Sequence, residues 1–300
     1  MMTKEDVARE MRDLQDYICG ELENLDSAGR FIEDKWQREQ GGGGRTRIIE
    51  SDQLIEKGGV NFSEVYGEVT PMMKRNTEIT GDSFFATGVS IVLHPNNPHV
   101  PIIHMNVRYF EMDNGTYWFG GGIDLTPHYI VPSQAKEFHV GLKAICDKYS
   151  QDFYPKFKTW ADNYFFIPHR DETRGIGGIF FDHISEDASL SKQNILDFCM
   201  DLGREFPKLY EHQANLGRDK EASEEEYSWM HLRRGRYVEF NLVHDRGTKF
   251  GLVSGGRTES ILMSLPKNAS WVYNSVSVSG SKEQKTLALL VKDVDWLNID

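Results

Sequence analysis

The sequence has few cysteines, and these fit neither a secreted nor a metal-scaffolded protein. Only Cys19, Cys146 and Cys199 occur in 300 residues, far apart and without a CxxC pair. They predict neither a disulfide framework nor a structural zinc site. The N-terminus also lacks the apolar region of a secretory signal and carries acidic residues that a mitochondrial presequence avoids. We therefore expect a cytoplasmic protein.

Basic residues are outnumbered, and long apolar runs are missing. The chain has 34 Lys and Arg against 46 Asp and Glu, a formal net charge of -12. Such a balance disfavours nucleic acids and anionic membranes as partners. The longest stretch without Asp, Glu, Lys or Arg is 83–107, but it contains three prolines and three histidines. A bilayer helix does not accept that composition, so we expect no membrane span.

Large apolar side chains are abundant. Hydrophobic residues make up 39% of the chain and aromatic residues 12%, which is typical of a globular protein with a substantial core. No repeat or low-complexity linker divides the chain, so we predict a single domain over 1–300. Strand patterns cluster rather than alternate strictly with helices, which favours an α+β fold.

The first half of the chain begins with helical spacing and continues with strand patterns. Residues 1–40 predict a helical N-terminal segment of one or two amphipathic helices, and 46–70 predict extended chain. Residues 83–93 and 100–110 read as an antiparallel hairpin. Asn114-Gly115 is a strong turn signal, which places a third strand after it.

The second half of the chain contains both helix and strand patterns. Its expected elements are helices over 133–166, a strand at 175–181, helices to about 218, strands at 236–243 and 260–265, and a closing helix at 282–294.

Polar residues share one face of the predicted hairpin. Ser90 and His94 lie in phase on one strand, and His104, Asn106 and Arg108 lie in phase on the next. With an even register sum both sets occupy the same face. An amphipathic strand facing solvent would look the same, but five polar groups in phase within a nearly uncharged stretch favour a site. A buried Arg108 would need a carboxylate partner, and a ligand could supply it.

Three glycines precede Asp124 in the segment WFGGGIDLTP. They would let a flat ligand approach the backbone or form a bulge that aims Asp124. In the alternative, Asp124 caps a turn before Pro127, which is a common role for aspartate.

Arginines recur beside glycines, and a subset could form a local anion site. Gly255, Gly256 and Arg257 could bind an anion through backbone N–H groups and one guanidinium. Four histidines also suggest a metal, because imidazole suits several transition metals. Their spacing lacks a compact motif, so packing or solvation explains each of them equally well. The four are His94, His104, His139 and His169.

From Gly42 onward the chain resembles oxygen-dependent coproporphyrinogen III oxidase, a family of haem-pathway enzymes. The resemblance rests on GGGGRTRIIESDQLIEKGGVNFSEVYGE, IVLHPNNPHVPIIHMNVRYFE, WFGGGIDLTPHY, YFFIPHRDETRGIGGIFFDH, RRGRYVEFNLVHDRGTKFGL and SGGRTESILMSLP. It implies a large antiparallel sheet flanked by helices on both faces, and a homodimer formed through about 237–271. It also implies a reaction with coproporphyrinogen III and O2 that needs no flavin, haem or nicotinamide.

The resemblance also assigns roles to residues. It implies that His104 transfers protons, and it places the aspartate of the family motif at Asp124. A divalent metal on the four histidines is assigned to some members and doubtful in others. The substrate contacts that it implies are Ser90, Asn106, Val107, Arg108, Gly255, Gly256 and Arg257.

Together these features give a working hypothesis. Two propionates of coproporphyrinogen III become vinyl groups, giving protoporphyrinogen IX, with O2 as the oxidant. Asp124 would polarise or deprotonate a pyrrole N–H, so that the electron-rich ring reacts with O2, and His104 would transfer protons. The alternatives are a carrier that binds an anionic tetrapyrrole without chemistry, and a histidine-metal oxygenase or hydrolase for another carboxylate.

Overall fold

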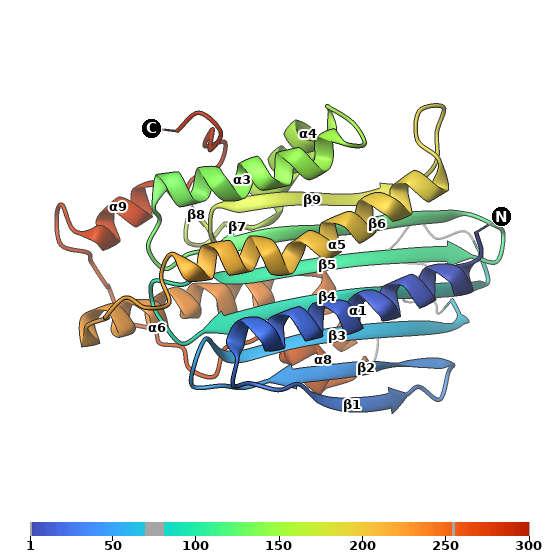
Figure 1. The fold of residues 1–300 in the computed structure, drawn as a ribbon, viewed down its shortest axis with the longest axis horizontal. Coiled ribbons are helices and arrows are strands. Elements are labelled where there is room, and N and C mark those ends of the chain that lie inside the picture. Colours follow the sequence, from blue (N-terminus) through green and yellow to red (C-terminus); the bar gives the residue numbers. More distant parts are fainter. Residues whose placement is uncertain (1, 70–80, 254–255, 300) are drawn as a thin grey trace.

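A large antiparallel sheet runs through the middle of the computed structural model, which describes residues 2–69, 81–253 and 256–299 (Figure 1). Its strands follow the order β1-β2-β3-β4-β5-β6-β9, and β7 and β8 form a separate small hairpin. The strands are β1 (Ile32–Gln37), β2 (Gly42–Ile49), β3 (Ile55–Glu68), β4 (Ser83–Pro95), β5 (Ile102–Met112), β6 (Tyr117–Thr126), β7 (Phe166–Ile167), β8 (Glu172–Thr173) and β9 (Gly177–Ile184).

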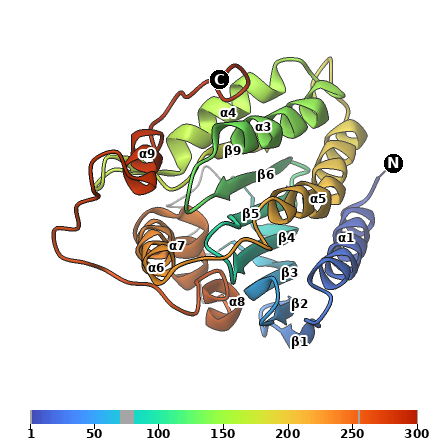
Figure 2. The same cartoon turned by 60° about the vertical axis from the view of Figure 1, so that its left-hand side comes forward.

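Helices cover both faces of the sheet, which confirms the predicted α+β architecture (Figure 2). On one face lie α1 (Lys4–Asp26), α3 (Pro132–Asp147) and α5 (Lys192–Asn215), while α4 (Phe153–Tyr164) packs against β9. On the other face lie α6 (Glu224–Glu239), the π-helical turn η1 (Phe240–His244), α7 (Arg246–Val253) and α8 (Thr258–Leu262). The short helix α9 (Lys282–Ala288) lies near the C-terminal end.

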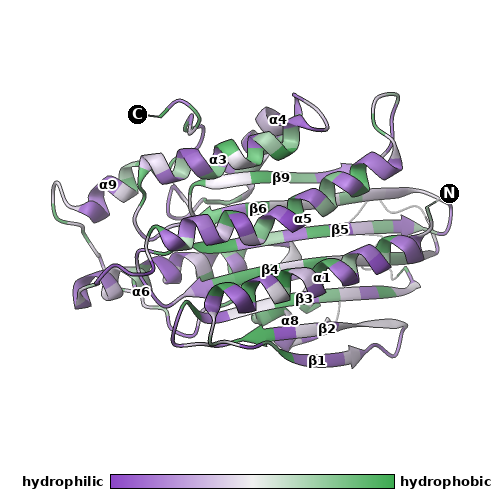
Figure 3. Ribbon diagram, in the orientation of Figure 1, coloured by the Kyte–Doolittle hydropathy of each residue, from purple (hydrophilic) through white to green (hydrophobic). Residues whose placement is uncertain are grey.

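The two faces of the central strands differ in polarity. Val89 and Ile91 of β4 and Met105 of β5 are fully buried in the core that α1 and α5 cover. Ser90 and Asn106 alternate with them and are only half-buried on the opposite face. Figure 3 shows apolar and polar residues following one another along these strands. The alternation puts the core on one side and leaves a polar surface on the other.

The hairpin predictions are confirmed. Ser90 pairs with Asn106, an even register sum, so the two predicted polar sets share one face. Gly115 has a φ of 83° in the turn between β5 and β6, a conformation that glycine adopts without strain. The face that carries Ser90 and Asn106 continues onto β6, where Gly122 and Asp124 lie opposite Asn106 and His104.

Three local predictions are wrong, and a fourth is wrong in its length. The helical N-terminal segment ends at Asp26 instead of reaching residue 40, because 32–37 pairs with the glycine-rich β2. Residues 236–243 are helix and π-turn rather than strand, since the Ser223 capping box starts α6 and the helix continues to Glu239. Residues 260–265 also begin in a helix, α8, rather than a strand. The closing helix is shorter than predicted, ending at Ala288.

Two further sequence features can be compared with the structure. None of the helices within 2–69, 81–253 and 256–299 is both long and apolar enough to cross a bilayer. Cys19, Cys146 and Cys199 are buried free thiols, and burial raises their pKa, so they are held in the unreactive protonated form.

Candidate active site

The half-buried face of the sheet forms a floor with very short side chains along one line. Asn61, Ser90, Asn106 and Gly122 lie opposite one another on four neighbouring strands. In the next row, Arg108 lies between Gly88 and Gly120. Glycines on either side leave room for the Arg108 guanidinium to lie across the neighbouring strand β6.

A histidine, an aspartate and an arginine meet at one end of this floor. His104 of β5 lies directly opposite Asp124 of β6, and its Nδ1 is 2.9 Å from Asp124 Oδ1. Arg174, just before β9, donates from Nε to Asp124 Oδ2 at 2.8 Å and from Nη2 to Oδ1 at 2.6 Å. The Asp124 side chain is 1% exposed. The two residues to which the sequence analysis gave separate catalytic roles, His104 and Asp124, thus contact each other directly.

Arg174 is held in an aromatic cage. Its guanidinium carbon lies 4.4 Å from the ring centre of Phe165 and 4.7 Å from the ring centres of Tyr237 and Phe240. Its Nη1 donates to Asn241 Oδ1 at 2.9 Å. Burial disfavours its charge, but Asp124 and the surrounding groups more than compensate and keep its pKa above the usual value. Arg174 is therefore a fixed, permanently charged partner of Asp124.

The π-helical turn explains how this cage is built. Phe240 and Asn241 are its first residues, and both contact Arg174. A π-turn places successive side chains differently from an α-helix, and such turns often occur at functional sites. Sequence reasoning missed both residues because it assigned 236–243 to a strand. It did not single out Arg174 among the arginines beside glycines, although the place of Arg174 just before a glycine-rich strand was a usable signal.

The charge state of this cluster follows from its contacts. Burial alone would raise the pKa of Asp124, but the charge of Arg174 and the hydrogen bonds from His104 and Arg174 outweigh burial and lower it. An ionised carboxylate only accepts hydrogen bonds. His104 Nδ1 therefore carries a hydrogen and donates a hydrogen bond to Asp124. That tautomer leaves Nε2 of His104 as a proton acceptor. The His104 side chain is 21% exposed, so a ligand can reach it.

Arg108 already has two partners on the floor. Its Nη1 donates to Asn106 Oδ1 at 2.8 Å, and its Nη2 lies 2.9 Å from Asp182 Oδ2 on β9. A guanidinium has five N–H donors, so some remain for an anion. His104 and Arg108 are four residues apart on one strand, which places them on the order of 13 Å from each other. Sequence reasoning did not identify Asp182.

The structure places the remaining predicted substrate contacts in different parts of the molecule. The side chain of Val107 is buried on the opposite, apolar face, so a contact between this residue and a ligand on the floor would have to involve its backbone. Gly255 lies outside the described residues. Gly256 donates its N–H to Gly251 O at 2.8 Å, and Arg257 forms an ion pair with Asp34 on the edge strand β1. In this structure Arg257 thus lies at the far end of the floor from Arg108.

The structure does not bring the four candidate metal histidines together. His94 lies under the helices of the polar face, where its Nε2–H donates to Ser264 O at 2.8 Å. His139 lies in α3, on the other side of the sheet. Both of its ring nitrogens are occupied, by Tyr154 OH and Ile176 O, each at 3.0 Å. Burial lowers the pKa of His139 to about 3, so it is neutral. A metal on this set does not fit these positions.

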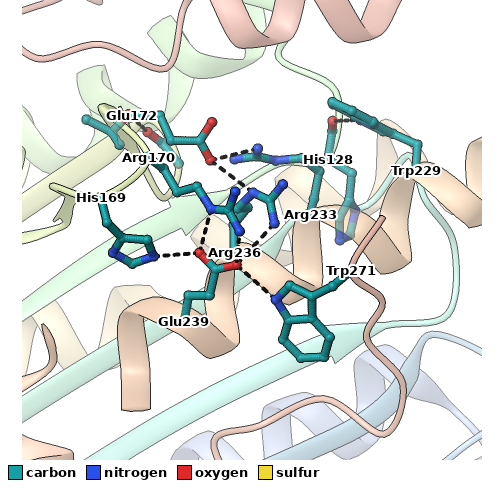
Figure 4. A network of polar contacts seen from close by, with 11 residues as sticks. His128, His169, Arg170, Glu172, Trp229, Arg233, Arg236, Glu239 and Trp271 are labelled. Atoms are coloured by element: carbon teal, nitrogen blue, oxygen red, sulfur yellow. Dashed lines mark hydrogen bonds and ion pairs between the residues drawn. The ribbon is translucent and has the colours of Figure 1, made fainter. Parts of the chain in front are cut away.

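His169 belongs to a separate network around Glu239 (Figure 4). Its Nε2 lies 2.8 Å from Glu239 Oε2 and its Nδ1 lies 2.9 Å from His244 Nε2. Arg170 binds the same carboxylate through two bonds, and Trp271 donates to it from its indole N–H at 2.9 Å. Across the described part of the chain, no group of three or more His, Cys, Asp or Glu side chains is arranged to hold a metal ion.

The site and fold together define a class of protein. A partly exposed histidine is oriented by a buried aspartate–arginine pair, and an arginine lies farther along the same floor, so the site suits proton transfer on an anionic ligand. The class is thus an α+β enzyme built on one face of a large antiparallel sheet. A family model described as coproporphyrinogen III oxidase matches residues 6–296. The chain belongs to the coproporphyrinogen III oxidase family, which gives it a role in haem biosynthesis.

Proposed function

We propose that the protein converts two propionates of coproporphyrinogen III into vinyl groups, with O2 as the oxidant, to give protoporphyrinogen IX. Each propionate loses CO2 and, from the carbon attached to the ring, the equivalent of a hydride. O2 accepts those two electrons together with protons and becomes hydrogen peroxide. The balanced step is R–CH2–CH2–COO⁻ + O2 + H⁺ → R–CH=CH2 + CO2 + H2O2. The electron-rich tetrapyrrole is the reductant, so we propose that no flavin, haem, nicotinamide or metal takes part.

The observation that carries the proposal is the His104–Asp124–Arg174 cluster on the same floor as Arg108. The reaction needs proton transfer near a propionate that is held in place, and His104 Nε2 and Arg108 are suited to these two tasks. Ser90 and Asn106, with Gly122 in the same row, provide a neutral polar surface for the ring between them. The family match over nearly the whole chain supports the same substrate.

The structure changes the role we assign to Asp124. The working hypothesis put its carboxylate against a pyrrole N–H, but both oxygens accept bonds from His104 or Arg174, and the group is almost completely buried. We propose instead that Asp124 acts through His104. It fixes the tautomer and stabilises the imidazolium that forms when Nε2 accepts a proton.

The proposed reaction is tested by incubating the protein with coproporphyrinogen III in air and under argon. We expect one O2 consumed and one CO2 released for each vinyl group formed in air, and no conversion under argon. Binding without CO2 release in air would instead identify a carrier. Conversion under argon would contradict the role of O2.

We also propose that the protein is a cytoplasmic homodimer that pairs through about 237–271. This region exposes Leu242, Val243, Leu252, Val253 and Trp271, each at least 40% accessible in the single chain. Several exposed apolar side chains within one segment of the chain are typical of a protein interface.

Val253→Asp should therefore shift the protein toward monomer in sedimentation velocity, because burying an unpaired carboxylate in an interface is costly. Val291→Asp is the matched control, since Val291 is also exposed but lies outside this region. A fully active monomer of the unmodified protein at assay concentration would contradict the dimer.

A further inference from the structure

Without a ligand, Arg108 is neutralised by a residue of the floor itself. Its Nη2 lies 2.9 Å from the Asp182 carboxylate. We propose that Asp182 is a specificity-determining residue, a resident carboxylate that occupies Arg108 until a carboxylate of the ligand takes its place. The inference rests on the proposed function, because it takes the ligand of Arg108 to be a propionate of a tetrapyrrole.

The backbone around Asp182 is shaped to aim this carboxylate. β9 places two residues, Asp182 and His183, opposite the single residue Gly120 of β6, which is a β-bulge. His183 has a φ of 52°, in the left-handed region that residues other than glycine seldom occupy. Its backbone N–H donates to Asp182 Oδ1 at 3.0 Å, and its ring stacks on Trp118 with centroids 4.8 Å apart. The irregular backbone thus holds Asp182 over the floor.

Gly120 provides the space in which the pair meets. Arg108 is on β5 and Asp182 is on β9, so the ion pair must cross the intervening strand β6. A Cβ at Gly120 would lie 2.5 Å from Asp182 Oδ1 and 2.8 Å from Arg108 Nη2. Any other residue would therefore push the two groups apart. The β-bulge at Asp182 and His183 and the glycine in the facing strand thus both favour the contact between Arg108 and Asp182.

The pair is placed where it can be exchanged. The Arg108 and Asp182 side chains are 36% and 24% exposed, whereas the Arg174–Asp124 pair is almost completely buried. Partly exposed ion pairs contribute little to stability, so the fold does not depend on this contact. When a small monocarboxylate displaces Asp182, Arg108 only exchanges one carboxylate partner for another. The net gain in binding free energy is therefore small. A ligand with several carboxylates and a large ring gains its other contacts as well, so the exchange selects for a polycarboxylate macrocycle.

The test measures binding of coproporphyrin III, the oxidised and unreactive tetracarboxylate, by quenching of its fluorescence. Asp182→Asn is nearly isosteric and still offers an oxygen to Arg108 and to the His183 N–H. It removes only the competing negative charge near the ligand carboxylate. We expect the variant to bind coproporphyrin III about fourfold more tightly, from the repulsion between two solvent-accessible carboxylates about 5 Å apart at a dielectric constant close to that of water.

Two further variants separate this effect from alternatives. Asp219→Asn changes the net charge equally at an exposed aspartate after α5 and should leave the dissociation constant unchanged. In an Arg108→Gln background the effect of Asp182→Asn should disappear, because without the guanidinium the ligand carboxylate is no longer held beside Asp182, where the two negative charges repel each other. Unchanged or weaker binding by Asp182→Asn would overturn the inference, since it would show that Asp182 only positions Arg108. A wild-type protein that neither binds the porphyrin nor oxidises the porphyrinogen would overturn the proposed function as well.

Discussion

Replacing Asp124 with asparagine is expected to lower turnover about 10²–10⁴-fold, the usual range for losing a group that supports proton transfer. The amide cannot stabilise a positively charged His104, and it presents an N–H₂ group where the carboxylate accepts bonds. If Asp124 only capped a turn, the alternative that the sequence left open, asparagine would cap as well and turnover would change little. The measurement is oxygen consumption with saturating coproporphyrinogen III.

The same substitution should also destabilise the fold. Arg174 is 3% exposed and binds Asp124 through two bonds, so asparagine leaves a buried guanidinium without its counter-charge. Breaking a buried pair from one side costs about 3–5 kcal/mol. The double variant Asp124→Asn/Arg174→Gln removes that charge and should regain part of the stability while turnover stays low. A double variant with normal turnover would show that Asp124 serves only to neutralise Arg174.

The pH dependence of this stability difference follows from the lowered pKa of Asp124. A carboxyl group whose pKa is lower in the folded state stabilises the protein above its unfolded-state pKa, about 3.9. That contribution is lost as the pH falls through the folded value. The difference in unfolding free energy between wild type and Asp124→Asn should thus shrink in urea titrations as the pH falls below about 4. A difference that instead grows as the pH falls would show that folding raises the pKa of Asp124.

The sequence was most informative where the physics is local. The period of two through 83–110 and the Asn114-Gly115 turn gave the hairpin, the next strand and the shared face of Ser90, His104 and Arg108. Each of these depends on side-chain alternation and turn geometry within about ten residues. The polar face could therefore be predicted without the fold.

The rest of the site depends on contacts that no local pattern records. Arg174 lies 50 residues from Asp124, and they meet only because β9 pairs with β6. Asp182 reaches Arg108 through a bulge whose position depends on that same pairing. The π-turn with Phe240 and Asn241 follows a helix that begins at the Ser223 cap, far outside the window in which 236–243 looked like a strand. In all three cases the deciding interaction lies outside the short stretch of sequence in which a local pattern can be recognised.

The remaining large effect is expected at His104, where catalysis and stability can be separated. In His104→Asn the side-chain N–H₂ lies where Nδ1–H was and can still donate to Asp124, so that carboxylate keeps its partner. The imidazole Nε2 is lost. Because His104 is partly exposed and makes one hydrogen bond, we expect the melting temperature to change by only a few degrees.

Turnover in His104→Asn should nevertheless fall about 10²–10⁴-fold, with little change in the dissociation constant for coproporphyrin III, because His104 acts on a proton and Arg108 binds the carboxylate. His212→Asn is the matched control, since His212 is exposed on α5 and pairs with Glu137 far from the floor. The His104→Asn variant thus separates the role of the cluster in proton transfer from its role in stabilising the fold. If it binds, melts and turns over like wild type, the group that moves the proton is not on this strand, and the buried Asp124–Arg174 pair would serve the fold alone.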